Sequence, residues 1–268
     1  MPYRAVFFDL FDTLVRFDRD RLPEIEIKGK SVRSTAGQLH TVLCRHVPGV
    51  TLDACYDALL ASWKEAERLR AIDHREVSAR ERFSFFFPAL GMDAAAVPRG
   101  LDEALIEAHR HELARAASFP AHHRPLLERL ARDHCLAVVS NFDYSPTALG
   151  ILDAAGVREL FTAIVVSDEV GWRKPRADIF HEALRRTGVE PHGTLFVGDR
   201  IDIDVAGAHA VGMDAAWINP DREALPAGVA PPSYEIRDLA ELDAARARAV
   251  ARIAVLKELA DAHEAASP

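Results

Sequence analysis

The sequence contains few cysteines and no long apolar run, and each of these absences excludes a class of protein. Three cysteines stand among 268 residues without a C-x-x-C pair, which argues against a disulfide framework or a cysteine zinc site. No apolar stretch approaches the roughly 20 residues that a membrane-spanning helix needs, and the apolar run near the N-terminus is too short for a signal peptide. We therefore expect a cytoplasmic protein with reduced thiols and no membrane partner.

Basic residues are also scarce. Lys and Arg total 33 against 41 Asp and Glu, so the net charge is −8, and no block of Lys or Arg occurs. A general nucleic-acid binder needs a basic face that neutralises phosphates, so we expect no nucleic-acid partner. The chain instead has an ordinary globular composition, 49% hydrophobic and 28% charged, and is long enough for one large domain or two smaller ones.

The apolar segments are short, and each ends at a polar or glycine-containing turn. They cover residues 5–8, ending at Asp9; 135–139, ending at Ser140-Asn141; 163–166, ending at Ser167-Asp168; 194–197, ending at Gly198-Asp199; and 215–218, ending at Asn219. Short continuous apolar runs that alternate with helical patterns are typical of buried parallel strands. The sequence therefore predicts an α/β fold, a Rossmann-like doubly wound parallel sheet, with ligands at the carboxyl ends of its strands.

Residues 16–118 interrupt this pattern, because they show helical periodicity and no convincing strand. One helical pattern follows Thr51, an N-cap residue type, and places apolar side chains at positions 52, 55, 59, 63 and 66. An insertion of this length between two strands indicates a separate domain. We predict an all-helical cap domain over 16–118, a core over 1–15 and 119–240, and a C-terminal helix over 241–268.

Four motifs at or near the predicted strand ends carry acidic, hydroxyl and basic side chains. They are Asp9-Leu10-Phe11-Asp12-Thr13-Leu14, Ser140-Asn141, Lys174 within G-W-R-K-P-R, and Gly198-Asp199 followed by Asp204. Their order and spacing resemble those of the haloacid dehalogenase-like hydrolase superfamily. The insertion after the first motif resembles the helical caps of that superfamily's subgroup I. The resemblance extends from residue 3 to about residue 242 and implies a hydrolase.

The resemblance implies a phosphatase that depends on Mg²⁺. A phosphate monoester is doubly negative, so an anionic nucleophile attacks it only when that charge is neutralised, and clustered carboxylates bind Mg²⁺. By the resemblance, Asp9 is the nucleophile and forms an aspartyl-phosphate. The ion is expected to be held by Asp9, the backbone carbonyl of Phe11, Asp199 and Asp204. A small phosphorylated metabolite is the expected partner, bound by a monomer or a homodimer.

Four further residues are expected to serve the same reaction. Ser140 and the backbone amide of Asn141 suit a phosphoryl oxygen, because they stand where a strand meets the turn before a helix. Lys174 is expected to place a positive charge against Asp9 and the transferring group. As a lysine in a strand-end loop, it is expected to add little to stability. Thr13 either orients the nucleophile or only closes the turn.

One position departs from the family pattern. The family's phosphatases carry a second Asp two residues after the nucleophile, which protonates the leaving alkoxide, and here that position is Phe11. Asp12 should face the opposite way on an extended segment. The family's 2-haloacid dehalogenases also lack this acid, but they do not use Mg²⁺ and do not share Gly198-Asp199. We therefore expect a phosphatase, with a 2-haloacid dehalogenase-type hydrolase or a weakly active phosphometabolite-binding protein as the alternatives.

Other polar residues are expected to be structural. His122 and His123 begin a predicted helix and are expected to cap it or to face solvent. Asp202 lies two residues before Asp204 and is expected to be solvated or to cap the turn. The predicted site therefore rests on the four motifs alone.

Overall fold

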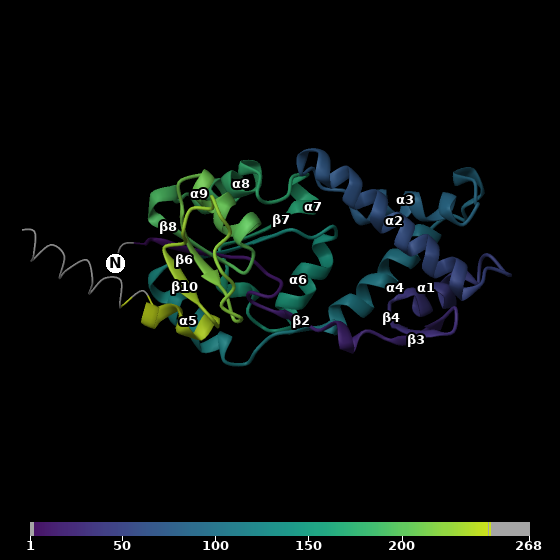
Figure 1. The fold of residues 1–268 in the computed structure, drawn as a ribbon, viewed down its shortest axis with the longest axis horizontal. Helices are drawn as coiled ribbons and strands as arrows, with labels where there is room; N and C mark the ends of the chain where they lie inside the picture. Colours follow the sequence, from purple (N-terminus) through teal and green to yellow (C-terminus); the bar gives the residue numbers. More distant parts are fainter. Residues whose placement is uncertain (1–2, 246, 248–268) are drawn as a thin grey trace, which may run out of the picture.

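The protein has two lobes, a core built on a parallel sheet and a cap attached at one end of it (Figure 1). The computed structural model describes residues 3–245 and 247. The cap lies over the carboxyl ends of the strands, because the amides of Glu76 and Ala79 donate to the carbonyls of Gly171 and Asp143, at 2.8 and 2.7 Å. The edge of the sheet that was expected to bind ligands therefore faces the cap.

The core sheet has six parallel strands in the order β10-β9-β8-β1-β6-β7. These strands are β1 (Ala5–Phe8), β6 (Cys135–Ser140), β7 (Ala163–Val166), β8 (Thr194–Gly198), β9 (Asp214–Ile218) and β10 (Tyr234–Ile236). Five of them coincide with the predicted apolar runs, and the sixth, β10, was not predicted. β1 lies between β6 and β8, so the first strand of the chain stands at the middle of the sheet.

Helices cover both faces of the sheet, as a doubly wound fold requires. Alternate residues of β1 face opposite sides: Val6 and Phe8 pack on one side, with the α5 and α6 residues, and Ala5 and Phe7 on the other, with the α8 and α9 residues. The core helices are α5 (His123–Asp133), α6 (Ser145–Ala154), α7 (Ser167–Val170), α8 (Ala177–Thr187) and α9 (Ala206–Ala210). The prediction of an α/β Rossmann-like core is confirmed.

The cap is mainly helical and has its own apolar core. Its helices are α1 (Ala36–Leu43), α2 (Leu52–Asp73), α3 (Ala79–Ala89) and α4 (Leu101–Ala116). Thr51 is the N-cap of α2, as predicted, and its side chain accepts a hydrogen bond of 3.2 Å from the amide of Ala54. Trp63 was expected on the buried stripe of this helix but is 53% exposed, because it lies beside a cavity between the lobes.

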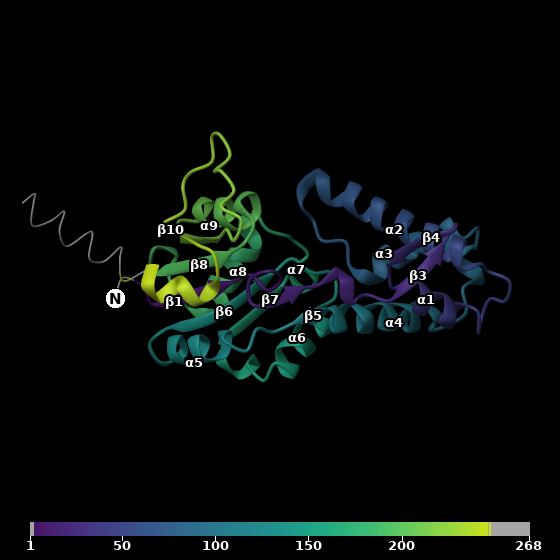
Figure 2. The ribbon, with the colours of Figure 1, turned by 60° about the horizontal axis from the view of Figure 1, so that its bottom comes forward.

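The cap also contains strands, so the expectation that residues 16–118 hold none was wrong. β3 (Glu24–Ile27) and β4 (Lys30–Arg33) form an antiparallel hairpin. Lys28 and Gly29 connect them with φ angles of 50° and 75°, the left-handed pair that a two-residue hairpin turn favours. β2 (Arg16–Phe17) and β5 (Ala117–Ser118) pair where the chain enters and leaves the cap, as Figure 2 shows.

Short helical turns complete the described chain. They are η1 (Arg19–Arg21), η2 (Ala94–Ala96), η3 (Arg158–Leu160), η4 (Pro191–Gly193), the π-helical η5 (Ile201–Val205) and η6 (Leu239–Glu241). Most of the C-terminal helix predicted over 241–268 lies outside the described residues. Within the part of the chain that is described, no helix combines the length and the apolarity needed to cross a membrane.

Candidate active site

The sheet order brings the predicted motifs together. Asp9 follows β1, and its amide donates to the carbonyl of Val197 in β8 at 2.9 Å. Asp199 comes directly after β8 and Ser140 ends β6. Because β6 and β8 are the two neighbours of β1, residues far apart in the sequence meet at one edge of the sheet.

Three carboxylates converge at this edge. Oxygen atoms of Asp9, Asp199 and Asp204 lie within 4.8 Å of one another. Burial raises the pKa of Asp9 to about 6, with Lys174 opposing the rise and Asp204 adding to it. Burial, with repulsion from Asp9 and Asp204, raises the pKa of Asp199 to about 8. Such a group of like charges is a site for a cation.

Gly198 is what allows Asp204 to reach this cluster. A Cβ atom at position 198 would collide with the carboxylate of Asp204. The same carboxylate accepts a hydrogen bond of 3.0 Å from the amide of Arg200, which orients it. Asp202 lies outside the cluster: it is exposed and pairs with Arg200 at 3.0 Å.

Lys174 is buried between two of the acids, next to Asp9, where its positive charge was expected. Its side chain is 2% exposed, and Nζ lies 2.6 Å from Oδ1 of Asp9 and 2.7 Å from Oδ1 of Asp204. Burial lowers the pKa of Lys174, but Asp204 and Asp9 more than offset this, so the pKa is raised and the lysine stays charged. Its removal would leave two buried acids without this cation, so the expectation that it adds little to stability needs the measurement described in the Discussion.

Asn141 positions Lys174 through its side chain. Its Nδ2 donates to the Lys174 carbonyl at 3.0 Å, and its Oδ1 accepts from the Lys174 amide at 2.7 Å. These two bonds fix the loop that carries the lysine against the end of β6. The backbone amide of Asn141, rather than its side chain, is what was predicted to contact substrate.

Two buried hydroxyls at this edge have no partner among the described residues. They are Oγ of Ser140, which is fully buried, and Oγ1 of Thr13, whose residue is 4% exposed. A buried hydroxyl without a hydrogen bond is unfavourable. Ser140 and Thr13 are thus free to bond a ligand that enters the site.

The side chain of Phe11 packs among other aromatic rings. Its ring lies 4.8 Å from that of Phe142 and 6.2 Å from that of Phe17, measured between centroids. The same three rings line a cavity of about 190 Å³. Asp12 has a φ of 58°, and its Oδ1 accepts from the Phe17 amide at 3.1 Å. The carboxylate of Asp12 therefore closes the turn and does not replace an acid at position 11.

A cavity of about 390 Å³ lies between the cap and the core next to Asn141. Two acids and six arginines line it, the arginines being Arg19, Arg33, Arg70, Arg82, Arg110 and Arg173. Five of these arginines pair with four acids, Glu24, Glu67, Glu76 and Asp143. The positive charge that is left favours an anionic occupant. Asn141, which lines the cavity, connects it to the backbone of Lys174 beside the carboxylate cluster.

Two buried acids that join the lobes were missed by sequence reasoning. Asp143, on the core loop after β6, accepts hydrogen bonds from Arg82 and Arg110 of the cap. Burial raises the pKa of Asp143, but Arg110, Arg82 and Arg70 lower it further, so the carboxylate stays ionised. Glu76 of the cap pairs with Arg70 at 2.8 Å and with Arg173 of the core at 2.6 Å.

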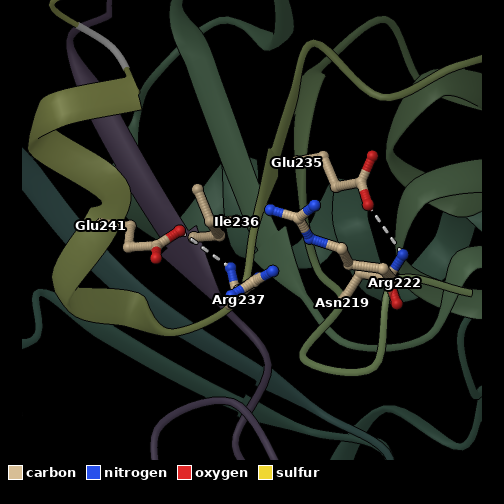
Figure 3. A pocket seen from close by; sticks show the side chains of 6 residues that line it. All are labelled: Asn219, Arg222, Glu235, Ile236, Arg237 and Glu241. Carbon is tan, nitrogen blue, oxygen red and sulfur yellow. Dashed lines mark hydrogen bonds between the residues drawn. The ribbon is translucent and has the colours of Figure 1, made fainter.

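Another pocket, of about 450 Å³, opens at the ends of β9 and β10 (Figure 3). Its described lining residues do not include any predicted site residue; they are Asn219, Arg222, Glu235, Ile236, Arg237 and Glu241. Asn219 Nδ2 donates to Glu235 at 2.8 Å, and the Arg237 amide donates to Glu241 at 3.1 Å. This pocket lies away from the carboxylate cluster and has no part in the site described above.

The fold and the site define a class of proteins with a Rossmann-like core, a carboxylate cluster and a buried lysine beneath an inserted cap. Consistently, residues 3–212 match the family of haloacid dehalogenase-like hydrolases. This match covers most of the chain, and the protein belongs to that family. Hydrolases of this family generally use a divalent metal ion, which the three carboxylates are suited to bind.

Known relatives include phosphatases and a dehalogenase. The glyceraldehyde 3-phosphate phosphatase of Methanothermobacter thermautotrophicus is 33% identical over 117 residues, which is 44% of this chain and 51% of that protein. The enzyme of the same name from Pyrococcus furiosus is 25% identical over 214 residues, 80% of each chain. The crystal structure of a 2-haloacid dehalogenase from Pseudomonas syringae pv. Tomato superposes with a TM-score of 0.69 at 26% identity, covering 92% of this chain and 99% of that one. The chain thus spans only about half of the first of these relatives.

Proposed function

We propose that this protein is a Mg²⁺-dependent phosphatase that acts on a small phosphorylated metabolite through an aspartyl-phosphate on Asp9. The observation that carries the proposal is the convergence of three carboxylates around a buried lysine. An all-oxygen donor set is the one that Mg²⁺ prefers. Asp9, Asp199, Asp204 and the carbonyl of Phe11 would hold the ion, which would offset the negative charge of the phosphoryl group.

The residues of the chain supply the nucleophile and hold the phosphoryl group. Oδ1 of Asp9 accepts from Lys174, so Oδ2 is the oxygen that attacks phosphorus while the bond to the leaving oxygen breaks. Asp9 is largely ionised above its pKa of about 6. The unpartnered hydroxyls of Ser140 and Thr13 donate to phosphoryl oxygens or to the nucleophile. Water then attacks the aspartyl-phosphate and releases phosphate.

The relatives and the arginine-lined cavity support a small anionic substrate. Two of the relatives are named for glyceraldehyde 3-phosphate, so three-carbon sugar phosphates are the first compounds to assay. The cavity of about 390 Å³ between the lobes is large enough for a metabolite of this size. Its arginines would attract such a dianion before it reaches Asp9.

A 2-haloacid dehalogenase-type reaction is the second candidate, and two observations favour it. An aromatic side chain, Phe11, occupies the position of the missing acid, and a halide leaving group needs no proton. A known 2-haloacid dehalogenase shares the fold over 92% of the chain. The cluster of three carboxylates argues against it, because a reaction without a metal ion has no use for such concentrated negative charge.

A direct comparison of two substrates tests the proposal. The purified full chain is assayed with p-nitrophenyl phosphate and with 2-chloropropionate, each in excess Mg²⁺ and in EDTA. We expect hydrolysis of the phosphate ester with Mg²⁺ and its loss in EDTA, because the repulsion among the acids is then uncompensated. Release of chloride that is insensitive to EDTA would instead establish the dehalogenase. Binding of phosphate esters without turnover under any of these conditions would leave a binding protein.

The absence of an acid at Phe11 predicts a strong dependence on the leaving group. Without a proton donor, the departing oxygen must leave as an anion, so aryl and acyl phosphates should be cleaved much faster than alkyl phosphates. General acid catalysis typically contributes about 10²–10⁴-fold, and we expect a difference of that order between p-nitrophenyl phosphate and glycerol phosphate. The measurement is the slope of log kcat against the pKa of the leaving group.

Two substitutions of Phe11 distinguish the effect of adding an acid from the effect of removing the ring. Phe11→Asp and Phe11→Asn remove the same contacts with Phe17 and Phe142, but only the first adds a proton donor. We expect Phe11→Asp to flatten the slope and to cleave alkyl phosphates faster than Phe11→Asn. Equal rates for alkyl and aryl phosphates in the wild-type protein, with chemistry limiting the rate, would contradict the argument.

A further inference from the structure

Two histidines and an aspartate meet at the base of the cap linkers, away from the carboxylate cluster. His122 and His123 stand at the start of α5, directly after the segment that returns from the cap, and Asp238 follows β10. Their ligand atoms lie within 4.8 Å of one another. Figure 1 shows the start of α5 beside the segment that follows β10. The two imidazole rings lie 4.6 Å apart between centroids. His122 faces solvent, one of its two expected roles, but His123 is buried and neither side chain caps the helix.

The hydrogen bonds of His123 determine which ring nitrogen carries its proton. Nδ1 lies 3.0 Å from the backbone carbonyl of Leu14, and a carbonyl only accepts, so Nδ1 is the donor. Burial lowers the pKa of His123, which favours the neutral ring, and Nε2 then carries a lone pair. This Nε2 is buried and has no hydrogen-bond partner among the described residues.

That lone pair faces another acceptor. Nε2 of His123 lies 4.0 Å from Oδ1 of Asp238, and Nε2 of His122 lies 3.0 Å from the same oxygen. A cation between these atoms would satisfy the buried lone pair of His123, which has no hydrogen-bond partner among the described residues. The His122 side chain is half exposed, so its proton can move to Nδ1, which would leave Nε2 as a second lone pair.

We propose that His122, His123 and Asp238 form a binding site for a divalent transition-metal ion such as Zn²⁺. Two imidazole nitrogens and one carboxylate oxygen are a common zinc donor set, with bonds of about 2.0–2.2 Å. Tetrahedral bonds of that length place ligand atoms about 3.3 Å apart, between the two distances found here. Solvent at the half-exposed His122 supplies the fourth ligand.

Neighbouring groups orient the side chains of His123 and Asp238 in a way that suits metal binding. The carbonyl of Leu14 fixes the orientation and the tautomer of His123, which is the usual outer partner of a metal-binding histidine. The carboxylate of Asp238 is oriented by the amide of Ala240 at 2.9 Å. Arg16 pairs with Oδ2 of Asp238 at 3.3 Å, and Oδ1, which accepts from the Ala240 amide, has a second lone pair that an ion can take. A bound ion would join the end of the nucleophile loop, the start of α5 and the segment after β10.

Zinc titration of the untagged full chain in excess Mg²⁺ tests this site, because Mg²⁺ would compete with zinc for the carboxylate cluster. The variants are His122→Gln, which removes one exposed ligand, and Asp238→Asn, which keeps the bond to the Ala240 amide and removes the charge. His111→Gln, an exposed histidine of α4, is the matched control. Uptake is followed by competition with a chromophoric zinc chelator, and thermal unfolding is measured in parallel.

We expect the wild type and His111→Gln to bind one Zn²⁺ that raises Tm. His122→Gln and Asp238→Asn should bind this ion at least about ten-fold more weakly and lose the rise in Tm. Equal zinc affinity and equal Tm shifts in all four proteins would place the ion elsewhere, for example at the free thiols, and overturn the proposal. Zinc uptake by none of them would also overturn it. Phosphatase activity does not enter the test, and the comparison of His122→Gln and Asp238→Asn with the wild type and His111→Gln holds whichever ion the carboxylate cluster binds, so its outcome is independent of the proposed function.

Discussion

Replacement of Asp9 by asparagine is expected to abolish phosphatase activity while leaving the protein folded. The amide keeps the shape of the side chain but has neither the negative charge of the nucleophile nor that of a metal ligand. Loss of a catalytic nucleophile lowers kcat by about 10³-fold or more. The measurement is kcat for p-nitrophenyl phosphate in excess Mg²⁺, from the release of p-nitrophenolate.

The fold should tolerate this change, because Asp9 lies among like charges. Its loss removes repulsion toward Asp199 and Asp204, and Lys174 keeps Asp204 as a partner at 2.7 Å. Asp202→Asn is the matched control, since Asp202 is exposed and pairs only with Arg200 among the described residues. We expect this control to retain the wild-type kcat. Turnover by Asp9→Asn above the uncatalysed background would rule out an aspartyl-phosphate at this position.

The central site was predictable because its residues follow directly from short-range patterns. Asp9, Ser140 and Asp199 each end an apolar run, and parallel strands bring their carboxyl ends to one edge whatever the length of the chain between them. Strand order was the missing information: only the structure places β1 between β6 and β8. For the clustering of Asp9, Asp199 and Asp204, the sequence offers only the family resemblance.

The cap hairpin could also have been predicted from the sequence. Residues 24–27 alternate between charged and apolar side chains, and Lys28-Gly29 then precedes a second short strand. Alternation followed by a two-residue turn containing glycine is a recognised hairpin signal. Helical periodicity dominates the rest of the insertion, and these eight strand residues are too few to change that overall pattern.

The contacts between the lobes could not have been predicted in this way. Asp143 is an ordinary loop acid in the sequence, and its partners Arg82 and Arg110 belong to two different cap helices. The chain contains 33 basic residues, and no local pattern shows which of them will be buried against Asp143. Such pairing depends on how the cap docks, which is a property of the tertiary fold.

Lys174→Met is expected to lower both activity and stability. In the wild type, Nζ contacts Asp9 and Asp204 at 2.6 and 2.7 Å, so it orients the nucleophile and offsets charge during phosphoryl transfer. Loss of such a group costs about 2.7–4 kcal/mol in the transition state, or about 10²–10³-fold in kcat. Methionine fills most of the volume of the lysine stem, so the change removes mainly the positive charge, including the contact of Nζ with the Phe196 ring at 5.1 Å from its centroid.

The loss of stability in Lys174→Met should depend on pH. The acids that remain, Asp9 and Asp199, determine whether the loss grows or shrinks as pH rises. Asp9 and Asp199 already have pKa values of about 6 and about 8, above the unfolded value of about 3.9. The folded state therefore binds protons more tightly, and the free energy of unfolding falls as pH rises from about 4 through these values. Lys174 lowers both pKa values, so its removal raises them further. The difference in stability between the two proteins should be small at low pH and grow as pH rises.

Thermal unfolding in EDTA at about pH 5 and about pH 8 measures this effect, since the two values bracket the pKa of Asp9 and reach that of Asp199. Lys64→Met, a change at an exposed lysine of α2, is the control and should match the wild type at both. We expect Tm of Lys174→Met to lie below that of the wild type by a margin that is several times larger at the higher pH. Protonation of the unpaired acids removes their charge at the lower pH, which is why the margin shrinks there. An equal margin at both pH values, together with an unchanged kcat, would mean that Lys174 only fills space and that its contacts with the two carboxylates serve neither folding nor catalysis.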